Sequence, residues 1–429
     1  MQELAEILVR GEDMIERNDY LKKLIDRMGN GRIKVITGIR RCGKSYLLFN
    51  IFYNYLLENG VDKSHIIALQ LDDRSNIKFQ NPEYLYDFVH NQITDNGKYY
   101  VLLDEVQFVH NFERVLNSFL HISNVDVYVT GSNAKFLSSD IITEFRGRGD
   151  QIYLTPLSFK EYYDYCKMDF EDAWNEYSMY GGRPFLLTCK TDEQKIHYLE
   201  NLFAETYIKD IVNRNNIRDT GVLEDVLNVV SSSVGSLTNP NKLSNSFKSI
   251  KNIDVAPNTI KQYLDYCIDS FLLQKAYRYD VKGKKYIDTP LKYYYTDIGL
   301  RNARLGFRQQ EESHIMENII FNELITRGYK VDVGVVTVSE KNENGNYVRK
   351  NLEVDFVCNL GYQRYYIQSA LAIDDAEKKR QEEKSLLNIH DSFRKIIIVR
   401  NNIKKWMDDN GTLFLSLKEF LINPDSMKA

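Results

Sequence analysis

The chain has 429 residues, of which 43% are hydrophobic and 27% charged, the balance of a globular protein with room for about three domains. Its formal net charge is −4, so no overall positive field draws it to nucleic acid, and any such site must be a local patch. It has no apolar run long enough to cross a membrane and no signal-peptide pattern, and its five scattered cysteines fit a reducing compartment. We therefore expect a cytoplasmic protein that does not act on membranes.

A glycine-rich segment between a β-branched stretch and an apolar stretch is the most informative motif. Residues 38–45 read Gly-Ile-Arg-Arg-Cys-Gly-Lys-Ser, after a predicted strand at 32–37 and before a predicted helix. Strand, turn and helix form an anion site, because the N–H groups of the turn point at phosphate oxygens. Lys44 supplies a cation for the β and γ phosphates, and the Ser45 hydroxyl is a ligand for Mg²⁺. The residues expected to bind ATP are Gly38, Ile39, Arg40, Arg41, Cys42, Gly43, Lys44, Ser45 and Tyr46.

Two further strands that end in polar side chains indicate a hydrolytic site. Residues 99–105 read as a buried strand that ends in Asp104 and Glu105. ATP hydrolysis needs a carboxylate on the magnesium side, which suits Asp104, and an orienter for the attacking water, which suits Glu105. The strand at 126–130 leads to Asn133, our candidate sensor of the γ-phosphate. The alternative is that Asp104 and Glu105 are a solvated acidic pair at a strand end. The position of the pair downstream of the phosphate loop favours the catalytic interpretation.

The order of the elements predicts an α/β protein with four domains. Residues 1–157 alternate strand and helix after N-terminal helices, as a doubly wound P-loop ATPase core does. Residues 158–215 are predicted as a helical lid. Residues 216–305 are predicted as a winged helix-turn-helix, and residues 306–429 as an α/β domain of the restriction-endonuclease-like type.

The lid carries two local signals. Ser158 and Glu161 have the spacing of a capping box, so a helix should begin between them. Gly181, Gly182, Arg183 and Pro184 then interrupt the helices and fix an unusual backbone path. This break is interpreted either as a contact with nucleotide or as a turn between two helices.

The segment 216–305 reads as three helices followed by a hairpin, which would be the wing of a winged helix. The second helix of the helix-turn-helix pair and this hairpin would together form a modest basic patch. The residues that would form it are Asn258, Thr259, Lys261, Lys282, Lys284 and Lys285. One interpretation is contact with the backbone of double-stranded DNA. The other is a packing module between domains, which suits a chain of net negative charge equally well.

The last domain has the element order of restriction-endonuclease-like nucleases. In such a site, Glu317 on a predicted helix would have an orienting role, and Asp355 on a predicted strand would bind magnesium. The next strand should carry Glu-x-Lys, a second metal ligand and a charge that positions water. This chain has Gln368-Ser369-Ala370 instead. A neutral amide is a poor ligand for a hard cation, and alanine cannot replace lysine. The fold prediction therefore stands, and the domain is predicted to be inactive as a nuclease.

Taken together, these motifs resemble the prokaryotic AAA-type ATPases that join a nucleotide-binding domain to a winged helix and a nuclease-like C-terminal domain. The matching stretches cover nearly the full length: 38–45, 103–107, 130–133, 147–148, 156–162, 181–184, 293–300 and 353–356. The resemblance implies binding of ATP with Mg²⁺ and hydrolysis of ATP. It also implies that Arg148, with Arg146 as the alternate, is a finger for a γ-phosphate, and that Pro184 lies near adenine.

Three functions are consistent with these residues. The favoured one is a nucleotide-driven switch that hydrolyses ATP, with double-stranded DNA and a protein both left open as its target. The alternatives are an ATP-regulated DNA nuclease, which the missing Glu-x-Lys disfavours, and a nucleotide-gated protein interaction module, which Asp104 and Glu105 together disfavour. A homo-oligomer is left open, because AAA-type sites are often completed by a neighbour's arginine.

Overall fold

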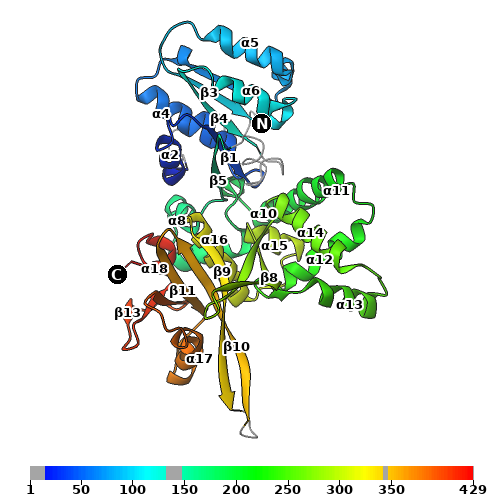
Figure 1. Cartoon of the computed structure of the whole chain (residues 1–429), viewed down its shortest axis with the longest axis vertical. Helices are drawn as coiled ribbons and strands as arrows, with labels where there is room; N and C mark the ends of the chain where they lie inside the picture. Colours follow the sequence, from blue (N-terminus) through cyan, green and yellow to red (C-terminus); the bar gives the residue numbers. More distant parts are fainter. Residues whose placement is uncertain (1–14, 132–146, 342–345, 429) are drawn as a thin grey trace. The chain divides into compact units, whose positions relative to one another are not determined.

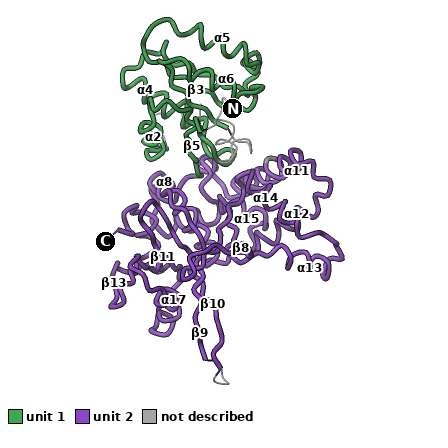
Figure 2. The backbone as a smooth tube through the Cα atoms, in the orientation of Figure 1, with its two compact units in different colours: residues 1–156 green, residues 157–429 purple. Residues whose placement is uncertain are grey.

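The chain folds into two compact units, Met1–Pro156 (unit 1) and Leu157–Ala429 (unit 2), coloured separately in Figure 2. The computed structural model describes residues 15–131, 147–341 and 346–428. The predicted boundary at 157 falls where the units meet in sequence. The predicted boundaries near 215 and 305 both lie inside unit 2, and that subdivision stays a prediction.

Unit 1 is built on a parallel five-stranded sheet with the strand order β2-β3-β4-β1-β5. The strands are β1 (Ile33–Gly38), β2 (Ile66–Gln70), β3 (Tyr99–Asp104), β4 (Val125–Thr130) and β5 (Gly149–Leu154). Alternate residues face opposite sides of the sheet, and Val35, Val101 and Val127 share one face and one core with residues of α5 and α6. On the other face, the Tyr128 ring lies 4.5 Å from the ring of Phe52.

The helices of unit 1 cover both faces of this sheet, as the near-continuous apolar strands require. They are α2 (Asn18–Ile25), α3 (Lys44–Tyr46), η1 (Leu47–Phe52), α4 (Tyr53–Glu58), η2 (Lys63–His65), η3 (Arg74–Gln80), α5 (Pro82–Gln92), η4 (Val106–Phe108) and α6 (Phe112–Phe119) (Figure 1). α3, η1 and α4 follow one another without a break, so one helical segment leads away from the phosphate loop.

Unit 2 begins with the helix that the capping-box spacing predicted. Ser158 accepts a hydrogen bond from the Glu161 N–H, and the Glu161 carboxylate accepts one from the Ser158 N–H, so the predicted cap of α8 is confirmed. The helices are α8 (Phe159–Cys166), α9 (Phe170–Tyr180), η6 (Pro184–Thr188), α10 (Asp192–Asn201), η7 (Leu202–Ile208), α11 (Lys209–Asn215), α12 (Thr220–Ser232), α13 (Pro240–Lys251), α14 (Pro257–Asp269), α15 (Ile298–Arg304), α16 (Glu312–Thr326), α17 (Ala376–Leu387) and α18 (Leu417–Ile422).

A mixed nine-stranded sheet runs through unit 2 with the strand order β13-β14-β12-β11-β10-β9-β7-β8-β6. Its strands are β6 (Leu237–Thr238), β7 (Leu273–Asp280), β8 (Lys285–Tyr295), β9 (Lys330–Lys341), β10 (Tyr347–Leu360), β11 (Gln363–Ala370), β12 (Arg394–Val399), β13 (Trp406–Met407) and β14 (Thr412–Ser416). β11 and β12 are parallel and joined through α17, whereas β9, β10 and β11 are antiparallel neighbours. Figure 1 shows β9 and β10 continuing together as a two-stranded ribbon.

The hairpin of β7 and β8, predicted as a wing, belongs to this same sheet. β7 pairs in parallel with β9, with Tyr279 opposite Gly334. Lys282 Nζ, in the turn of the hairpin, donates a hydrogen bond to the carbonyl oxygen of Thr337 at 2.9 Å. The hairpin is therefore fastened to β9 along one side, a pairing between distant segments that local sequence patterns do not reveal.

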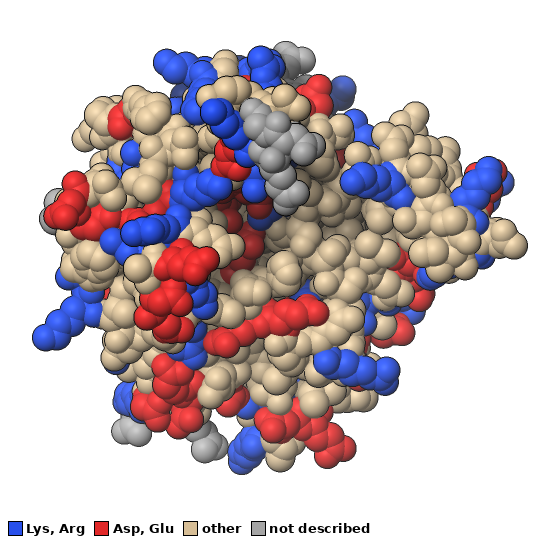
Figure 3. Space-filling model, turned by 90° about the horizontal axis from the view of Figure 1, so that it is seen from below, with Lys and Arg blue, Asp and Glu red and all other residues tan. Residues whose placement is uncertain are grey.

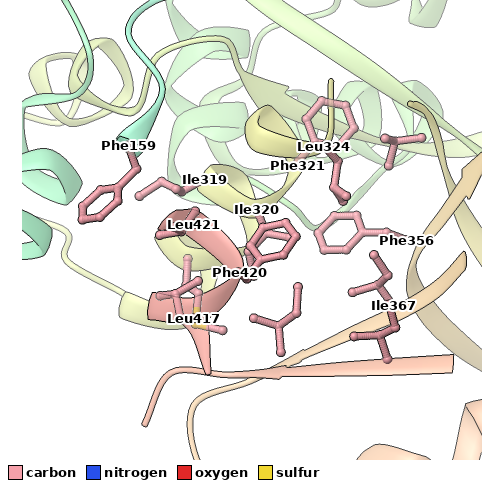
Figure 4. Close-up of a cluster of buried hydrophobic side chains, with 14 of the residues drawn as sticks. Phe159, Ile319, Ile320, Phe321, Leu324, Phe356, Ile367, Leu417, Phe420 and Leu421 are labelled. Atoms are coloured by element: carbon pink, nitrogen blue, oxygen red, sulfur yellow. The ribbon is translucent and has the colours of Figure 1, made fainter. Parts of the chain in front are cut away.

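An apolar cluster packs α16 against the sheet and against the helices α8 and α18 (Figure 4). The residues labelled there are Phe159, Ile319, Ile320, Phe321, Leu324, Phe356, Ile367, Leu417, Phe420 and Leu421. α16 is buried around most of its circumference, which its mainly apolar sequence explains. Across the described ranges, no helix combines the length and the apolar character that a membrane span requires.

Candidate nucleotide-binding site

The phosphate loop leaves β1 at its carboxyl end and runs into α3. Gly38 has a φ of +144°, and a Cβ there would lie 2.1 Å from the carbonyl oxygen of Leu154, so only glycine allows β5 to approach this closely. Arg41 and Gly43 also have positive φ, 57° and 95°, and they turn the chain into the helix. Cys42 is buried, and its thiol points at the Leu154 carbonyl oxygen with the sulfur 3.6 Å away.

Lys44 is held inside this loop. Its side chain is buried, and Nζ donates hydrogen bonds to the carbonyl oxygens of Gly38 and Ile39, each at 3.1 Å. Charge-assisted hydrogen bonds to phosphate oxygens are stronger than those to neutral carbonyl oxygens. The ammonium can therefore exchange its carbonyl partners for an anion that enters the loop.

Ser45 and Asp104, the two expected magnesium ligands, lie together although they come from α3 and β3. Asp104 is 2% exposed and hydrogen-bonds with the hydroxyls of Ser45 and Thr130. Burial raises the pKa of Asp104 to about 6, and the two hydroxyl donors oppose that shift. A carboxylate beside a hydroxyl suits a hard cation that takes its other ligands from phosphate and water, so these residues fit Mg²⁺. The part of the chain that the structure describes has no cluster of three or more His, Cys, Asp or Glu side chains placed to hold a metal.

Glu105 directly follows Asp104 and has a left-handed backbone conformation, with φ 51° and ψ 50°. This conformation is uncommon for residues other than glycine, and strain of this kind concentrates at functional sites. The Glu105 N–H donates a hydrogen bond to Thr130 Oγ1 at 3.0 Å, and its carboxylate accepts one from Gln107 Nε2. Thr130 thus fixes both carboxyl residues, because its hydroxyl also donates to Asp104.

Two polar residues at this edge of the sheet were missed by the sequence reasoning. Thr130 is the last residue of β4, and Asp72 follows β2 closely. Burial and the charge of Glu105 raise the pKa of Asp72, so the two carboxylates lie near one another. Polar residues at the ends of neighbouring parallel strands are the sequence signal that could have identified them, because these ends meet at one edge of the sheet.

Asn133 and Arg146, two of the other predicted residues, fall outside the described residues. Arg148 precedes β5 and donates a hydrogen bond to Asn117 at 3.5 Å, at the amino end of the sheet. The phosphate loop lies at the carboxyl end, about 20 Å away along the six residues of β5, so Arg148 does not reach the loop of its own chain. Pro184 belongs to unit 2, and its contact with adenine stays a prediction.

The Gly-Gly break in unit 2 is explained by a buried turn against the start of α15. A Cβ at Gly181 would lie 2.4 Å from Asp297 Oδ1, and a Cβ at Gly182 would lie 2.2 Å from the Leu157 carbonyl oxygen. The Gly182 N–H donates a hydrogen bond to Asp297 Oδ2 at 3.1 Å. The buried guanidinium of Arg183 approaches the same carboxylate, with Nε 3.5 Å from Oδ2. These contacts agree with the interpretation of the break as a turn between helices.

The two acidic residues singled out in residues 306–429, Glu317 and Asp355, also come together. Glu317 on α16 accepts hydrogen bonds on Oε1 from Lys292 Nζ at 2.9 Å and from the Tyr294 hydroxyl at 2.7 Å. Lys292 Nζ also lies 2.8 Å from Glu353 Oε1 on β10. Lys292 was not singled out from the sequence, and it brings a positive charge into the cluster from β8.

Asp355 in the same cluster is held by the neighbouring strand β11. It accepts hydrogen bonds from the Ser369 N–H at 2.8 Å, from the Ser369 hydroxyl at 2.7 Å and from Gln368 Nε2 at 3.2 Å. Burial raises the pKa of Asp355 to about 7, and the nearby charge of Glu317 adds to the shift. Gln368 therefore directs its amide N–H at Asp355, and Ala370 is an apolar core residue.

Comparison with known proteins supports an AAA-type core. An AAA domain family matches residues 30–163, and a domain family of unknown function matches residues 171–311. An uncharacterized protein of Haemophilus influenzae is 33% identical over 391 residues, covering 90% of this chain and 93% of that protein. An uncharacterized protein of Methanocaldococcus jannaschii is 27% identical over 363 residues, covering 82% and 77%. Among solved structures, the Aeropyrum pernix Orc1 protein in complex with DNA is similar over 70% of this chain and 96% of its own, with 11% identity and a TM-score of 0.28.

Proposed function

Since the chain belongs to the same family as the Haemophilus influenzae protein and contains an AAA-type domain, we propose that it is a magnesium-dependent ATPase that acts as a nucleotide-driven switch. One observation carries this proposal. The loop residues Lys44 and Ser45 meet Asp104 at the carboxyl edge of a parallel sheet, with Glu105 fixed beside them by Thr130. That arrangement combines a phosphate cradle, a magnesium site and a group for the attacking water.

Each residue has a separate role in this proposal. Lys44 neutralises charge on the β and γ phosphates, and Ser45 and Asp104 hold the magnesium ion, which supplies further charge stabilisation when bound. Glu105 orients the water that attacks the γ-phosphoryl group, with Gln107 and Thr130 restraining its position. Asn133 remains the proposed sensor of the γ-phosphate.

Arg148 is proposed to act on a neighbouring subunit. It lies at the opposite end of the sheet from its own phosphate loop, so a finger role requires a second copy of the chain. With this role for Arg148, the protein would be a homo-oligomer in which each nucleotide contacts two subunits.

Double-stranded DNA is the proposed partner, through the segment that contains α12, α13, α14 and the β7–β8 hairpin. The order of these elements is that of a winged helix. Asn258 and Lys261 are exposed near the start of α14, and Lys284 and Lys285 are exposed in the hairpin. Figure 3 shows Lys and Arg interleaved with Asp and Glu over one face, so that face carries no broad basic surface for DNA.

ATP turnover by the wild-type protein and by Glu105→Gln, with and without double-stranded DNA, tests this function. We expect magnesium-dependent turnover that Lys44→Ala abolishes, whereas Glu105→Gln binds ATP and turns it over at least about 100-fold more slowly. Stimulation by DNA would support the DNA partner, and turnover indifferent to DNA would favour a protein partner. A wild-type protein that binds no ATP in the presence of magnesium would contradict the proposal.

A further inference from the structure

A buried lysine occupies the carboxylate cluster of the nuclease-like segment. Lys292 on β8 is 3% exposed, and its Nζ lies 2.9 Å from Glu317 Oε1 and 2.8 Å from Glu353 Oε1. Burial alone would lower the pKa of this ammonium, but the carboxylates of Glu317, Asp355 and Glu353 outweigh it and raise the pKa. The side chain is therefore charged inside the protein, between a helix and a strand that are distant in sequence.

The carboxylates of this cluster take their partners from the chain itself. The Tyr294 hydroxyl donates to Glu317, and Asp355 accepts its hydrogen bonds from Ser369 and Gln368. A Cβ at Gly235 would lie 3.1 Å from Glu317 Oε1, so the turn between α12 and β6 also packs closely against this carboxylate. Backbone, hydroxyl, amide and ammonium donors thus surround oxygens that would otherwise be free to bind a cation.

These residues do not fit a divalent metal ion. The Lys292 ammonium already pairs with Glu317 Oε1 and Glu353 Oε1, so a metal ion at these oxygens would have to displace it or repel it at close range. Gln368 presents an N–H donor toward Asp355, whereas a metal site needs oxygen acceptors that converge on one point. The cluster therefore contains a cation of its own, and N–H donors point at the Asp355 carboxylate that a metal site would leave free for the ion.

We propose that the Lys292 ammonium is the resident cation of this cluster and takes the place that a divalent metal ion holds in a nuclease of this architecture. The cluster then joins β8, α16 and β10 instead of cleaving phosphodiester bonds. The inference concerns unit 2 and does not rest on the proposed ATPase activity of unit 1, so each can fail without the other.

The test is to remove the ammonium and to ask whether the vacated position accepts a metal ion. Lys292→Met keeps an unbranched side chain but removes the charge, and Lys350→Met on the exposed part of β10 is the matched control. Both tryptophans of the chain, Trp174 and Trp406, lie in unit 2, so tryptophan fluorescence reports thermal unfolding of this unit. Each protein is melted with and without Mn²⁺, in the absence of nucleotide.

We expect Mn²⁺ to raise the midpoint of Lys292→Met by about 2–4 °C or more while leaving wild type and Lys350→Met unchanged. The added stabilisation should disappear in the double variant Lys292→Met/Asp355→Asn. A folded Lys292→Met protein without a Mn²⁺ shift, or a wild type that shifts as much as the variant, would overturn the proposal.

A second measurement covers the outcome that Lys292→Met does not fold. Mn²⁺ uptake by the wild-type protein is compared with uptake by Asp355→Asn in the natural Lys292 background. Equal uptake supports the proposal, because the cluster then holds no metal. Lower uptake by Asp355→Asn, or Mn²⁺-dependent cleavage of plasmid DNA that this variant loses, would overturn it.

Discussion

The Thr130 hydroxyl connects the two carboxyl residues of the candidate ATPase site. It donates to Asp104 and accepts from the Glu105 N–H, so one side chain restrains both the proposed magnesium ligand and the proposed water-orienting residue. A hydroxyl in this position needs both a donor and an acceptor partner, and serine can supply the same atoms. Valine has nearly the shape of threonine but supplies neither.

We therefore expect Thr130→Val to lower ATP turnover by about 10- to 100-fold, the usual cost of removing a group that orients a metal ligand. Thr130→Ser, the matched control, should stay near wild type. Steady-state turnover of the three proteins at saturating magnesium and ATP measures the effect. Full activity of a folded Thr130→Val protein would show that the hydroxyl does not position the site.

A pair of acidic residues in unit 2 predicts a pH effect on stability. Burial and a hydrogen bond to Asp408 raise the pKa of Glu383 to about 7, whereas the unfolded chain should titrate near the ordinary value of 4.5. The folded protein thus binds an extra proton between about pH 4.5 and 7, and the ionised Glu383 destabilises it increasingly as the pH rises through this range.

Glu383→Gln should remove this dependence, because an amide stays neutral and keeps an N–H donor for Asp408. We expect the variant to unfold at a higher temperature than wild type at pH 8, with the difference shrinking toward pH 5. Tryptophan fluorescence melts across this pH range measure it. Glu377→Gln on the exposed side of α17 is the matched control for the substitution.

Sequence reasoning singled out candidate site residues that follow local spacing and missed residues that are brought in by tertiary contacts. Lys44 and Ser45 follow a glycine turn, and the structure brings Ser45 to Asp104, as a phosphate loop and a strand end predict. Lys292 gave no such signal, because its partner Glu317 is 25 residues away on another element. Arg148 was placed by resemblance alone, and only the strand pairing shows that it lies far from its own loop.

At the scale of elements, the turn between α9 and η6 is set by glycines that admit the Asp297 carboxylate. Gly181 combines a positive φ of 79° with a Cβ position 2.4 Å from Asp297 Oδ1. Gly328, which ends α16, has a φ of 87° but open space around its Cβ position. An alanine at Gly328 would meet backbone strain alone, whereas an alanine at Gly181 would meet backbone strain and a steric clash.

We expect Gly328→Ala to destabilise unit 2 by about 1 kcal/mol, the cost of a left-handed alanine. Gly181→Ala should cost about 2–4 kcal/mol, because it must also displace a buried carboxylate that is paired with Arg183. Urea unfolding followed by tryptophan fluorescence gives both values. Equal losses in the two variants would mean that the Asp297 contact contributes nothing.

The strands were largely predictable from apolar patterns, but their pairing was not. The runs that form β1, β3 and β4 were recognised to within one residue at each end. The parallel pairing of β7 with β9 joins segments that the sequence placed in different domains, and no local property of either strand encodes it. Side-chain periodicity identifies which face of a strand is buried. Which strands pair with each other depends instead on the packing of the whole unit.

At the scale of the whole molecule, the place of Arg148 predicts that hydrolysis requires more than one copy of the chain. Arg148→Ala should reduce turnover by about 100-fold or more, because an arginine finger stabilises charge in the transition state. Mixing Arg148→Ala with Lys44→Ala should restore turnover above that of either variant, since one subunit supplies the intact loop and the other the arginine.

The matched control is Arg32→Ala, an exposed residue at the same end of the sheet, which should keep wild-type turnover. Steady-state ATPase assays of each variant and of equal mixtures provide the measurement. An inactive Arg148→Ala protein that mixing does not rescue would assign Arg148 a structural role. Wild-type activity of Arg148→Ala would contradict a finger role altogether.

The short outermost strands of the sheet in unit 2 limit how copies of this protein can associate. β6 and β13, the two ends of the strand order, are each two residues long and offer little backbone for another chain to pair with. The ribbon of β9 and β10 carries the charged residues Lys341, Arg349 and Lys350 toward its tip, and such charges discourage strand addition. Extension of this sheet from chain to chain is therefore disfavoured, which protects the folded protein against aggregation at high local concentration.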